Sequence, residues 1–198
     1  MGQTVHARSE AAAPSESPVR QRILASASRM FREQGIRAVS ADRILADAGC
    51  AKVTFYRHFP TKDDLVVAYL EAELDDARRV VEAAALLPES ARMEALARAV
   101  GDEMCAPGFR GCPFINAAAE YADPDHPVRA VVTRFREWLT GEIAARLEAL
   151  GVDDAEDRAA EIMMLRDGAM VAGYLTGDVE GVTAALQRSV GAIVGRSI

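Results

Sequence analysis

Residues 35–65 of the chain read GIRAVSADRILADAGCAKVTFYRHFPTKDDL, and this stretch decides the fold. Gly35 is suited to end a first helix, because glycine adopts the left-handed conformation without strain, and Ser40 can cap the next helix through its side-chain oxygen. That second helix is expected over residues 41–48 and ends at Gly49. Only two residues follow before the pattern becomes helical again, so the two helices must cross steeply, as in a helix-turn-helix.

The third helix, expected over residues 52–58, is too short to persist alone, so apolar side chains must hold it against the first two helices. We assign this role to Val53, Phe55 and Phe59. The opposite face is polar and carries Lys52, Thr54, Tyr56, Arg57 and His58. Cations and hydroxyls suit phosphates and base edges, and an aromatic ring can lie on the sugar backbone. The pattern therefore predicts a short helix that docks into a groove of DNA.

The rest of the chain is also expected to be helical. At 198 residues and 50% hydrophobic, it can bury a sizeable core in one or two domains. Alanine and leucine are abundant and no segment alternates convincingly, so we predict an all-α protein of about nine helices. Thr61 should cap the fourth helix, with Asp64 forming a capping box. The later helices are expected over residues 62–87, 91–105 and 114–122, then from a cap at Asp125 to about 151, from Asp153 to about 177, and on to about 194.

Charge divides the chain into two parts. Residues 18–62 hold nine basic and three acidic side chains, a net charge of +6, whereas residues 71–198 hold 13 basic and 23 acidic ones, a net charge of −10. The basic end is drawn to phosphates and the acidic end is repelled by them. We therefore expect docking on nucleic acid in one orientation, with binding that weakens as salt rises.

The sequence lacks the motifs that are typical of several other functions. Di-iron helical bundles use two Glu-x-x-His pairs, and none of His6, His58 and His126 has that context. No nucleophile motif or phosphate-binding glycine loop occurs, so we predict no enzyme activity, no cofactor and no metal site. Residues 1–17 read as a disordered tail without the apolar core of a signal peptide, and no stretch approaches the ~20 apolar residues of a membrane span. A cytoplasmic protein without a membrane partner is expected.

The stretch quoted above resembles the N-terminal DNA-binding domain of the tetracycline-repressor (TetR) family of bacterial transcriptional regulators. The resemblance covers about residues 18–78, and the matching positions are Gly35, Ser40, Ile44, Ala48-Gly49, Phe55-Tyr56-Arg57-His58-Phe59, Lys62 and Leu65. It implies a three-helix DNA-binding domain in which the phosphates are contacted by Ser40, Tyr56, His58 and Lys62. It also implies that the side chains at or near base edges are Lys52, Thr54 and Arg57.

Residues 111–121 and 123–128 resemble a subset of the same family, through the runs GCPFINAAAEY and DPDHPV. This resemblance implies an effector-binding and dimerisation domain over residues 79–198, with a homodimer paired through the last two helices. The eighth helix has an apolar surface too broad for one partner, formed by Ile162, Met163, Leu165, Ala169, Met170, Ala172, Gly173 and Leu175. Its small residues, with Gly168, would let a second helix approach closely. The ninth helix would complete a four-helix bundle between two chains with Val182, Leu186, Val190 and Ile193.

Candidates for an effector pocket are aromatic, methionine or polar residues on the inward faces of the fifth to eighth helices. They are Met93, Phe109, Phe114, Asn116, Glu120, Tyr121, Phe135, Trp138, Met163, Met170 and Tyr174. The alternative for each is ordinary core packing. Asn116 and Glu120 lie four apart on one face of a short apolar helix, where a buried amide and carboxyl require partners. These partners are either a ligand or the capping amides of a neighbouring helix.

The function predicted from these patterns is that of a ligand-responsive regulator, a repressor that binds a palindromic operator as a homodimer and is released by a small molecule. A single short helix reads few base pairs, which is why two copies related by a twofold axis are expected. The alternatives are a nucleoid-type DNA-binding protein without an effector, or an activator. A thiol-based redox sensor using Cys105 and Cys112 is a further alternative.

Overall fold

The computed structural model describes residues 17–195, and the expected tail over residues 1–17 falls almost wholly outside them. The described residues form nine α-helices and no strands, which confirms the all-α prediction. The helices are α1 (Pro18–Gln34), α2 (Ala41–Ala48), α3 (Lys52–His58), α4 (Lys62–Ala85), α5 (Glu89–Met104), α6 (Pro113–Glu120), α7 (Pro127–Ala149), α8 (Ala155–Thr176) and α9 (Val179–Val194). Within residues 17–195, none of these helices is both long and apolar enough to cross a bilayer.

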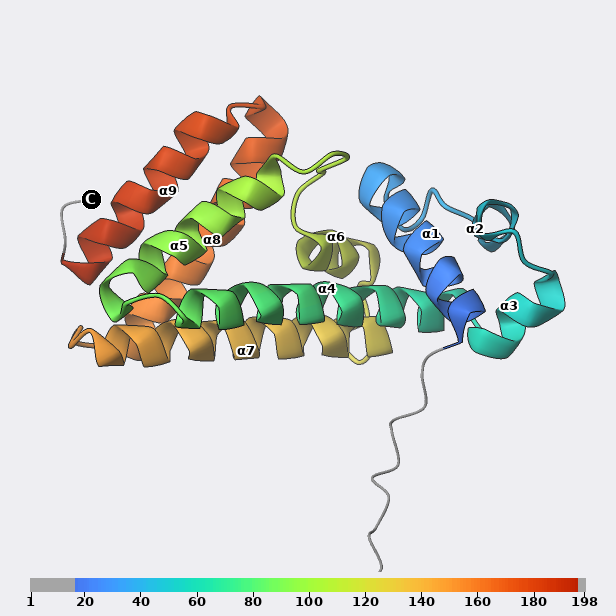
Figure 1. The fold of residues 1–198 in the computed structure, drawn as a ribbon, viewed down its shortest axis with the longest axis horizontal. Coiled ribbons are helices and arrows are strands. Elements are labelled where there is room, and N and C mark those ends of the chain that lie inside the picture. Colours follow the sequence, from blue (N-terminus) through green and yellow to red (C-terminus); the bar gives the residue numbers. More distant parts are fainter. Residues whose placement is uncertain (1–16, 196–198) are drawn as a thin grey trace, which may run out of the picture.

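The first three helices form a compact unit at one end of the molecule, which we call the head (Figure 1). Its local signals act as predicted. The Ser40 hydroxyl accepts a hydrogen bond from the amide of Arg43, and Gly49 ends α2 in the left-handed conformation, with φ of 59°. Ile23, Ile44 and Phe55 are fully buried at the centre of the head. The hydrophobic effect of this small core fixes how the three helices cross.

Helix α4 carries the chain out of the head and runs beside α7 into the body (Figure 1). It starts with a complete capping box, in which Thr61 and Asp64 satisfy each other's backbone amides. The rings of Phe31 on α1 and Tyr69 on α4 meet edge to face with their centroids 5.4 Å apart. This contact joins the head to the long helix at a buried point.

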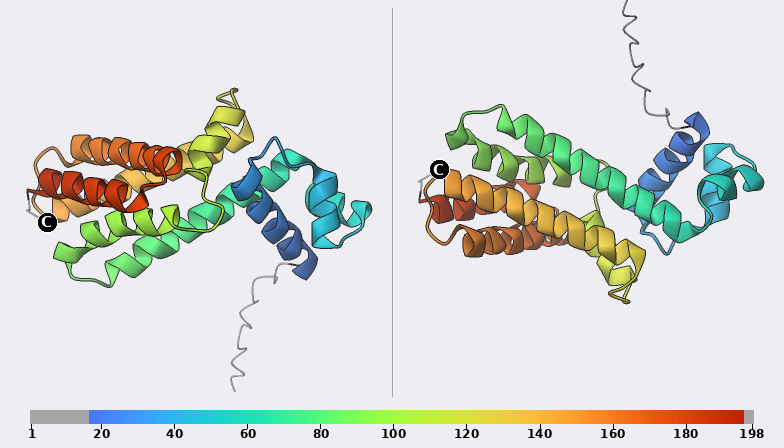
Figure 2. Two further views of the ribbon diagram at one scale, coloured as in Figure 1. Left: turned by 90° about the horizontal axis from the view of Figure 1, so that it is seen from above. Right: turned by 90° about the horizontal axis from the view of Figure 1, so that it is seen from below.

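The remaining helices form the body at the other end of the molecule (Figure 2). Helix α5 packs on α9, and α8 packs on both α7 and α9. One apolar core runs from the head along α4 into α6 and α7, with Phe114 and Phe135 among its members, and a second core within the body includes Met93, Leu147, Met163 and Leu186. The body is therefore a helical bundle with its own interior.

Several predicted helix ends are wrong by a few residues. The fourth helix ends at Ala85, the fifth begins at Glu89, and the sixth spans Pro113–Glu120. Two caps also differ. Helix α7 is capped by the His126 ring, whose Nδ1 accepts from the amide of Val128 at 3.2 Å, and not by Asp125. Helix α8 starts after Asp154, which has a φ of 55° and makes no side-chain capping bond.

The prediction for the last two helices needs a correction. Leu186 and Val190 of α9 are buried inside their own chain, so they are not free to pair with a second copy. Gly173 of α8 also faces inward, where it leaves room for the side chain of Met104 on α5. The chain thus uses these apolar and small residues to close its own bundle, because α5 packs against α8 and α9.

Candidate DNA interface and effector cavity

Helix α3 presents its polar face to solvent at the tip of the head. Lys52, Tyr56 and Arg57 are exposed, and Thr54 and His58 are half-buried. Phe55 and Phe59 are buried, as predicted, but Val53 is 80% exposed. Val53 lies two positions before Phe55, which is more than half a helical turn, so the two side chains point in opposite directions. The predicted packing role of Val53 is therefore wrong.

The exposed face of α3 is internally ordered. The ammonium of Lys52 lies 6.0 Å from the centroid of the Tyr56 ring, within the range of a cation–π contact. The Tyr56 ring in turn stands edge to face on buried Phe55, with centroids 5.2 Å apart. This stack holds an aromatic ring and a cation side by side on the surface, without an acidic neighbour on α3. Such a surface suits a polyanion.

The other two residues predicted to contact phosphates, Ser40 and Lys62, lie outside α3 and differ in exposure. Ser40 is exposed at the start of α2, where its hydroxyl is used as the helix cap. Lys62 is half-buried, and its Nζ donates to the carbonyl of Ile36 at 2.6 Å. Burial lowers the pKa of Lys62. This lysine therefore ties the start of α4 to the connection between α1 and α2.

A polar cluster fixes α2 on α1. Asp47 of α2 accepts from the Ser26 hydroxyl at 2.5 Å and from the Arg29 guanidinium at 2.6 Å. The bond from Ser26, and then that from Arg29, lowers the pKa of the Asp47 carboxyl. Since α2 sets the position of α3, these bonds help to orient the exposed face of α3.

A cavity of about 420 Å³ lies between the head and the body. Helices α4 to α9 all contribute walls, and so do the α5–α6 connection and the end of α1. Five of the predicted pocket residues line it, namely Met93, Phe109, Phe114, Asn116 and Phe135. The stacked rings of Phe114 and Phe135, with centroids 3.7 Å apart, form a flat part of its wall. A cavity of this size and apolar character suits a small organic molecule.

The other six predicted pocket residues do not line this cavity. Met163 and Met170 are buried in the two cores, and Tyr174 is 46% exposed on the outside of α8. Trp138 packs beside Phe135, but its other side meets the guanidinium of Arg78 on α4. The remaining two, Glu120 and Tyr121, line a separate small cavity where α6 meets the head.

The side-chain partners of Glu120 are backbone amides, but they belong to the connection after α1 and are not the predicted capping amides of a helix. Its carboxylate accepts from the backbone amides of Ile36 at 3.2 Å and Arg37 at 2.7 Å, in the α1–α2 connection. Arg37 returns a bond of 2.9 Å to the Glu120 carbonyl. Beside it, the Tyr121 hydroxyl donates to Asp63 at 2.7 Å. These bonds, which we call the α6 latch, connect the end of α6 to the head.

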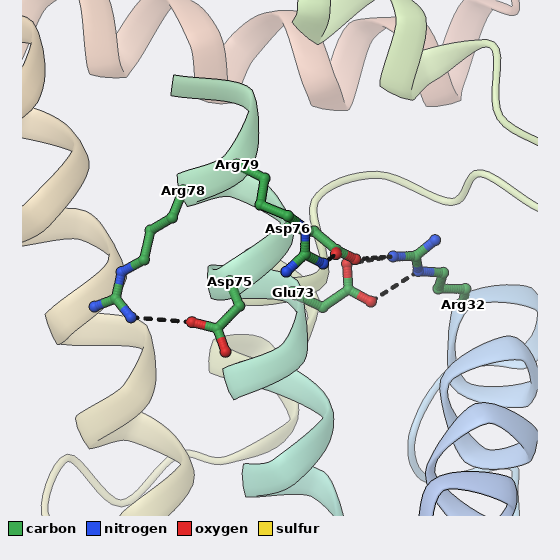
Figure 3. Close-up of polar contacts among 6 residues, drawn as sticks. All are labelled: Arg32, Glu73, Asp75, Asp76, Arg78 and Arg79. Carbon is green, nitrogen blue, oxygen red and sulfur yellow. Dashed lines mark hydrogen bonds and ion pairs between the residues drawn. The ribbon is translucent and has the colours of Figure 1, made fainter. Parts of the chain in front are cut away.

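The polar end of the 420 Å³ cavity centres on an ion pair that the sequence analysis missed (Figure 3). Arg32 of α1 donates from Nε to Glu73 Oε1 at 2.8 Å and from Nη2 to Glu73 Oε2 at 2.6 Å. Burial raises the pKa of Glu73, and the bonds from Arg32 oppose that shift. The pair joins residues 41 positions apart, so no local pattern could have found it.

A buried cation also borders the cavity. Arg166 of α8 lies with its guanidinium 5.3 Å from the centroid of the Phe135 ring. It also donates to Asp167 at 3.2 Å and lies 3.6 Å from the Cys112 sulfur. Cys112 is buried whereas Cys105 is exposed. Over residues 17–195, no group of three or more histidine, cysteine or acidic side chains is arranged to hold a metal ion.

Comparison with known proteins agrees with this architecture. Residues 23–69 match the family model described as bacterial regulatory proteins, tetR family. A crystal structure of SCO4454, a TetR-family transcriptional regulator from Streptomyces coelicolor, is 40% identical, with a TM-score of 0.85, over 89% of this chain and 94% of that one. A TetR transcriptional regulator from Legionella pneumophila has the same fold at 22% identity, with a TM-score of 0.77 over 88% and 98% of the two chains.

The match to an HTH-type transcriptional regulator of Staphylococcus aureus is shorter. It is 39% identical over 56 residues, which are 28% of this chain and 30% of that protein. The helix-turn-helix head, the all-helical body and these similarities together place the chain among DNA-binding transcriptional regulators. The similarity to SCO4454 extends through head and body alike. The chain belongs to the TetR family.

Proposed function

We propose that the protein is a repressor that binds a palindromic operator as a homodimer and is released when a small molecule occupies the 420 Å³ cavity. In this proposal residues 18–78 bind DNA, and residues 79–198 bind the effector and pair the subunits. The observation that carries the proposal is that head and body share one cavity. Phe31, Arg32 and Ile36 of the head line it together with the helices of the body.

Most of the proposed DNA contacts lie on the exposed face of α3, and two others lie at the starts of α2 and α4. Lys52, Thr54 and Arg57 are assigned to base edges, and Ser40, Tyr56, His58 and Lys62 to phosphates. Val53 joins the first group, because an 80% exposed aliphatic side chain at the start of α3 suits the methyl group of thymine. Lys62 would have to exchange its bond with the Ile36 carbonyl for a phosphate, or contribute through its charge alone.

Pairing of two subunits is supported by the outer face of the last two helices. On α8 the exposed apolar side chains Met164, Val171 and Leu175 follow one another at helical spacing. Gly168 lies between them with open space around it. On α9 the outer positions Ala185 and Ala192 are small and exposed, so a second helix could approach closely. Two copies of this surface could form a four-helix interface.

Release would act through α1 and α4. Helix α4 lines the cavity with Tyr69 and Glu73 and enters the head at Lys62, so a tilt of α4 moves the recognition helix. In a homodimer, such a tilt changes the distance between the two α3 helices, which must fit half-sites about one DNA turn apart. The effector shifts the equilibrium only if it binds the released form more tightly than the DNA-bound form.

The experiment that tests this function is selection of bound sequences from a random DNA pool, followed by binding measurements at several salt concentrations. We expect a palindromic consensus, with Tyr56→Ala weakening binding to all sequences and Lys52→Ala relaxing preference at particular positions. A protein that binds all sequences alike at physiological salt would instead be of the nucleoid type. If neither substitution changes binding, α3 does not lie in the groove and the proposal fails.

A further inference from the structure

We propose that the 420 Å³ cavity binds an amphipathic organic cation, a molecule with an apolar tail and one positively charged group held near Glu103. This inference rests on the proposed effector role of the cavity for its regulatory consequence, whereas binding itself can be measured without DNA. It follows from three features of the cavity: its apolar deep end, its acidic end and the pairing of its arginines.

The apolar end of the cavity is the part that would hold the apolar tail of the ligand. Walls from Met93, Ala97, Ile143, Ile162 and Leu186 enclose it, and none of these side chains carries a polar atom other than the methionine sulfur. All five residues are at least nine-tenths buried. Transfer of apolar surface from water into such a space is the main source of affinity. An alkyl or aromatic group fits this end, and a charged group does not.

The acidic end holds carboxylates that make no direct hydrogen bond or ion pair. Glu73 is paired with Arg32, and Asp76 is paired with Arg79 (Figure 3). Asp102 and Glu103 also line the cavity, and among residues 17–195 no side-chain hydrogen bond or ion pair is found for either carboxylate. Glu103 is exposed, yet the surrounding protein atoms desolvate its carboxyl and raise its pKa, while the charges of Arg166 and Arg32 oppose that shift. A ligand cation would compensate this charge.

The arginines of the cavity are already engaged. Arg32 makes its two-point contact with Glu73. Arg166 is held between Asp167, the Cys112 sulfur and the face of the Phe135 ring. Arg110 donates to the carbonyl of Glu33 at 3.5 Å. An anionic ligand would compete with the carboxylates that already face Arg32 and Arg166 and would also approach Asp102 and Glu103, so the four acidic and three basic side chains of the cavity disfavour it.

Aromatic rings add to the preference for a cation. Tyr69 and Phe109 line the cavity, and so does Phe31, whose ring centroid already lies 5.9 Å from the Lys62 ammonium. The faces of such rings attract a cation, most strongly where water is excluded. The same ring faces do not attract an anion, because they carry partial negative charge.

The test compares three probes with one tail: decyltrimethylammonium, 1-decanol and decyl sulfate. Each is titrated into the full chain by calorimetry, below the concentration at which it forms micelles. We expect one cation to bind per subunit, about tenfold more tightly than the alcohol, and the sulfate to bind more weakly than the alcohol. The inference is overturned if decyl sulfate binds as tightly as decyltrimethylammonium, or more tightly.

Two further measurements assign the charge to Glu103. Glu103→Gln should weaken the cation by about tenfold and leave the alcohol unchanged. The matched control is Glu94→Gln, which removes an exposed carboxylate from the same helix outside the cavity. If both variants lose the cation equally, or neither does, the assignment is wrong. In the parent protein, cation binding should also release protons near the raised pKa of Glu103, measured as a heat that depends on the buffer.

The consequence for DNA is measured separately. A cation that binds and lowers operator affinity supports both the inference and the proposed function. A cation that binds with the expected preference but leaves DNA binding unchanged supports the ligand class and contradicts effector release. If DNA binds as proposed but the probes show no preference for positive charge, the inference alone fails.

Discussion

Arg32 of α1 and Glu73 of α4 form a two-point ion pair, with donor to acceptor distances of 2.8 and 2.6 Å, at the place where the head meets the 420 Å³ cavity. The carboxylate is 9% exposed, whereas the guanidinium side chain is 45% exposed. The pair is thus open to solvent on the arginine side and closed on the glutamate side. It connects the cavity wall directly to the first helix of the head (Figure 3).

Loss of the arginine should destabilise the protein in a pH-dependent way. Arg32→Ala leaves the buried Glu73 carboxylate unpaired, at a cost of about 1–3 kcal/mol at pH 7. Burial already raises the pKa of Glu73, and removal of Arg32 removes the contact that opposes this shift. The folded state then binds the proton more tightly than the unfolded state, so stability falls as pH rises above the ordinary glutamate pKa.

Urea denaturation at pH 5 and pH 7 measures this effect. The deficit of Arg32→Ala should be smaller at pH 5. Arg79→Ala is the control, because its partner Asp76 is exposed on the same helix, and it should change stability by less than about 0.5 kcal/mol at either pH. An equal deficit for Arg32→Ala at both pH values would show that Glu73 stays charged without its partner.

Val53 and Phe55 allow a sharp test of the orientation of α3. Val53 is 80% exposed and Phe55 is fully buried. Val53→Ser should therefore change stability by less than about 0.5 kcal/mol, while Phe55→Ala should cost about 3–5 kcal/mol. In the selection experiment, Val53→Ser should alter the preferred base at one position of each half-site. A large loss of stability in Val53→Ser would restore the packing role that the sequence had suggested.

The α6 latch predicts a local change in backbone protection. Glu120→Gln keeps the shape of the side chain but places one oxygen and one NH₂ group before the two amides of Ile36 and Arg37. We expect hydrogen exchange at these two amides to become faster by about tenfold, for a local loss of about 1.4 kcal/mol. Glu161→Gln is the control, since that carboxylate pairs with Arg158 on the surface of α8. Unchanged exchange at Ile36 and Arg37 would mean that the latch does not hold the connection.

If the subunits pair as proposed, substitutions on the outer face of α8 should convert the dimer into a monomer. Met164 is 65% exposed and Val171 is 43% exposed on the outer face of α8. Met164→Glu combined with Val171→Glu places two carboxylates in each subunit at the proposed interface, where they face those of the partner. Sedimentation should show dimers for the parent and monomers for the variant, with the helical signal retained. Leu86→Glu is the control, because Leu86 is 88% exposed at the end of α4, away from this face.

Local sequence determined the elements and their ends where capping and periodicity act within a few residues. Helices α2 and α3 begin and end at the predicted residues, because Ser40, Gly49 and the two buried phenylalanines of α3 fix them. The capping box of α4 was also visible, since Thr61 and Asp64 are three residues apart. The all-α class and the helix-turn-helix followed from these short-range signals.

Only the tertiary structure decided which face each side chain meets and which distant groups pair. Arg32 and Glu73 are 41 residues apart, and Glu120 lies 84 residues from the Ile36 amide that it binds. The apolar face of α9 was assigned to a second subunit, yet Leu186 and Val190 are buried in their own chain. An apolar stripe indicates that one face of a helix is buried, but it does not indicate which element buries that face. The packing of the whole chain selects the partner, because the long-range contacts that bury each face depend on every other helix.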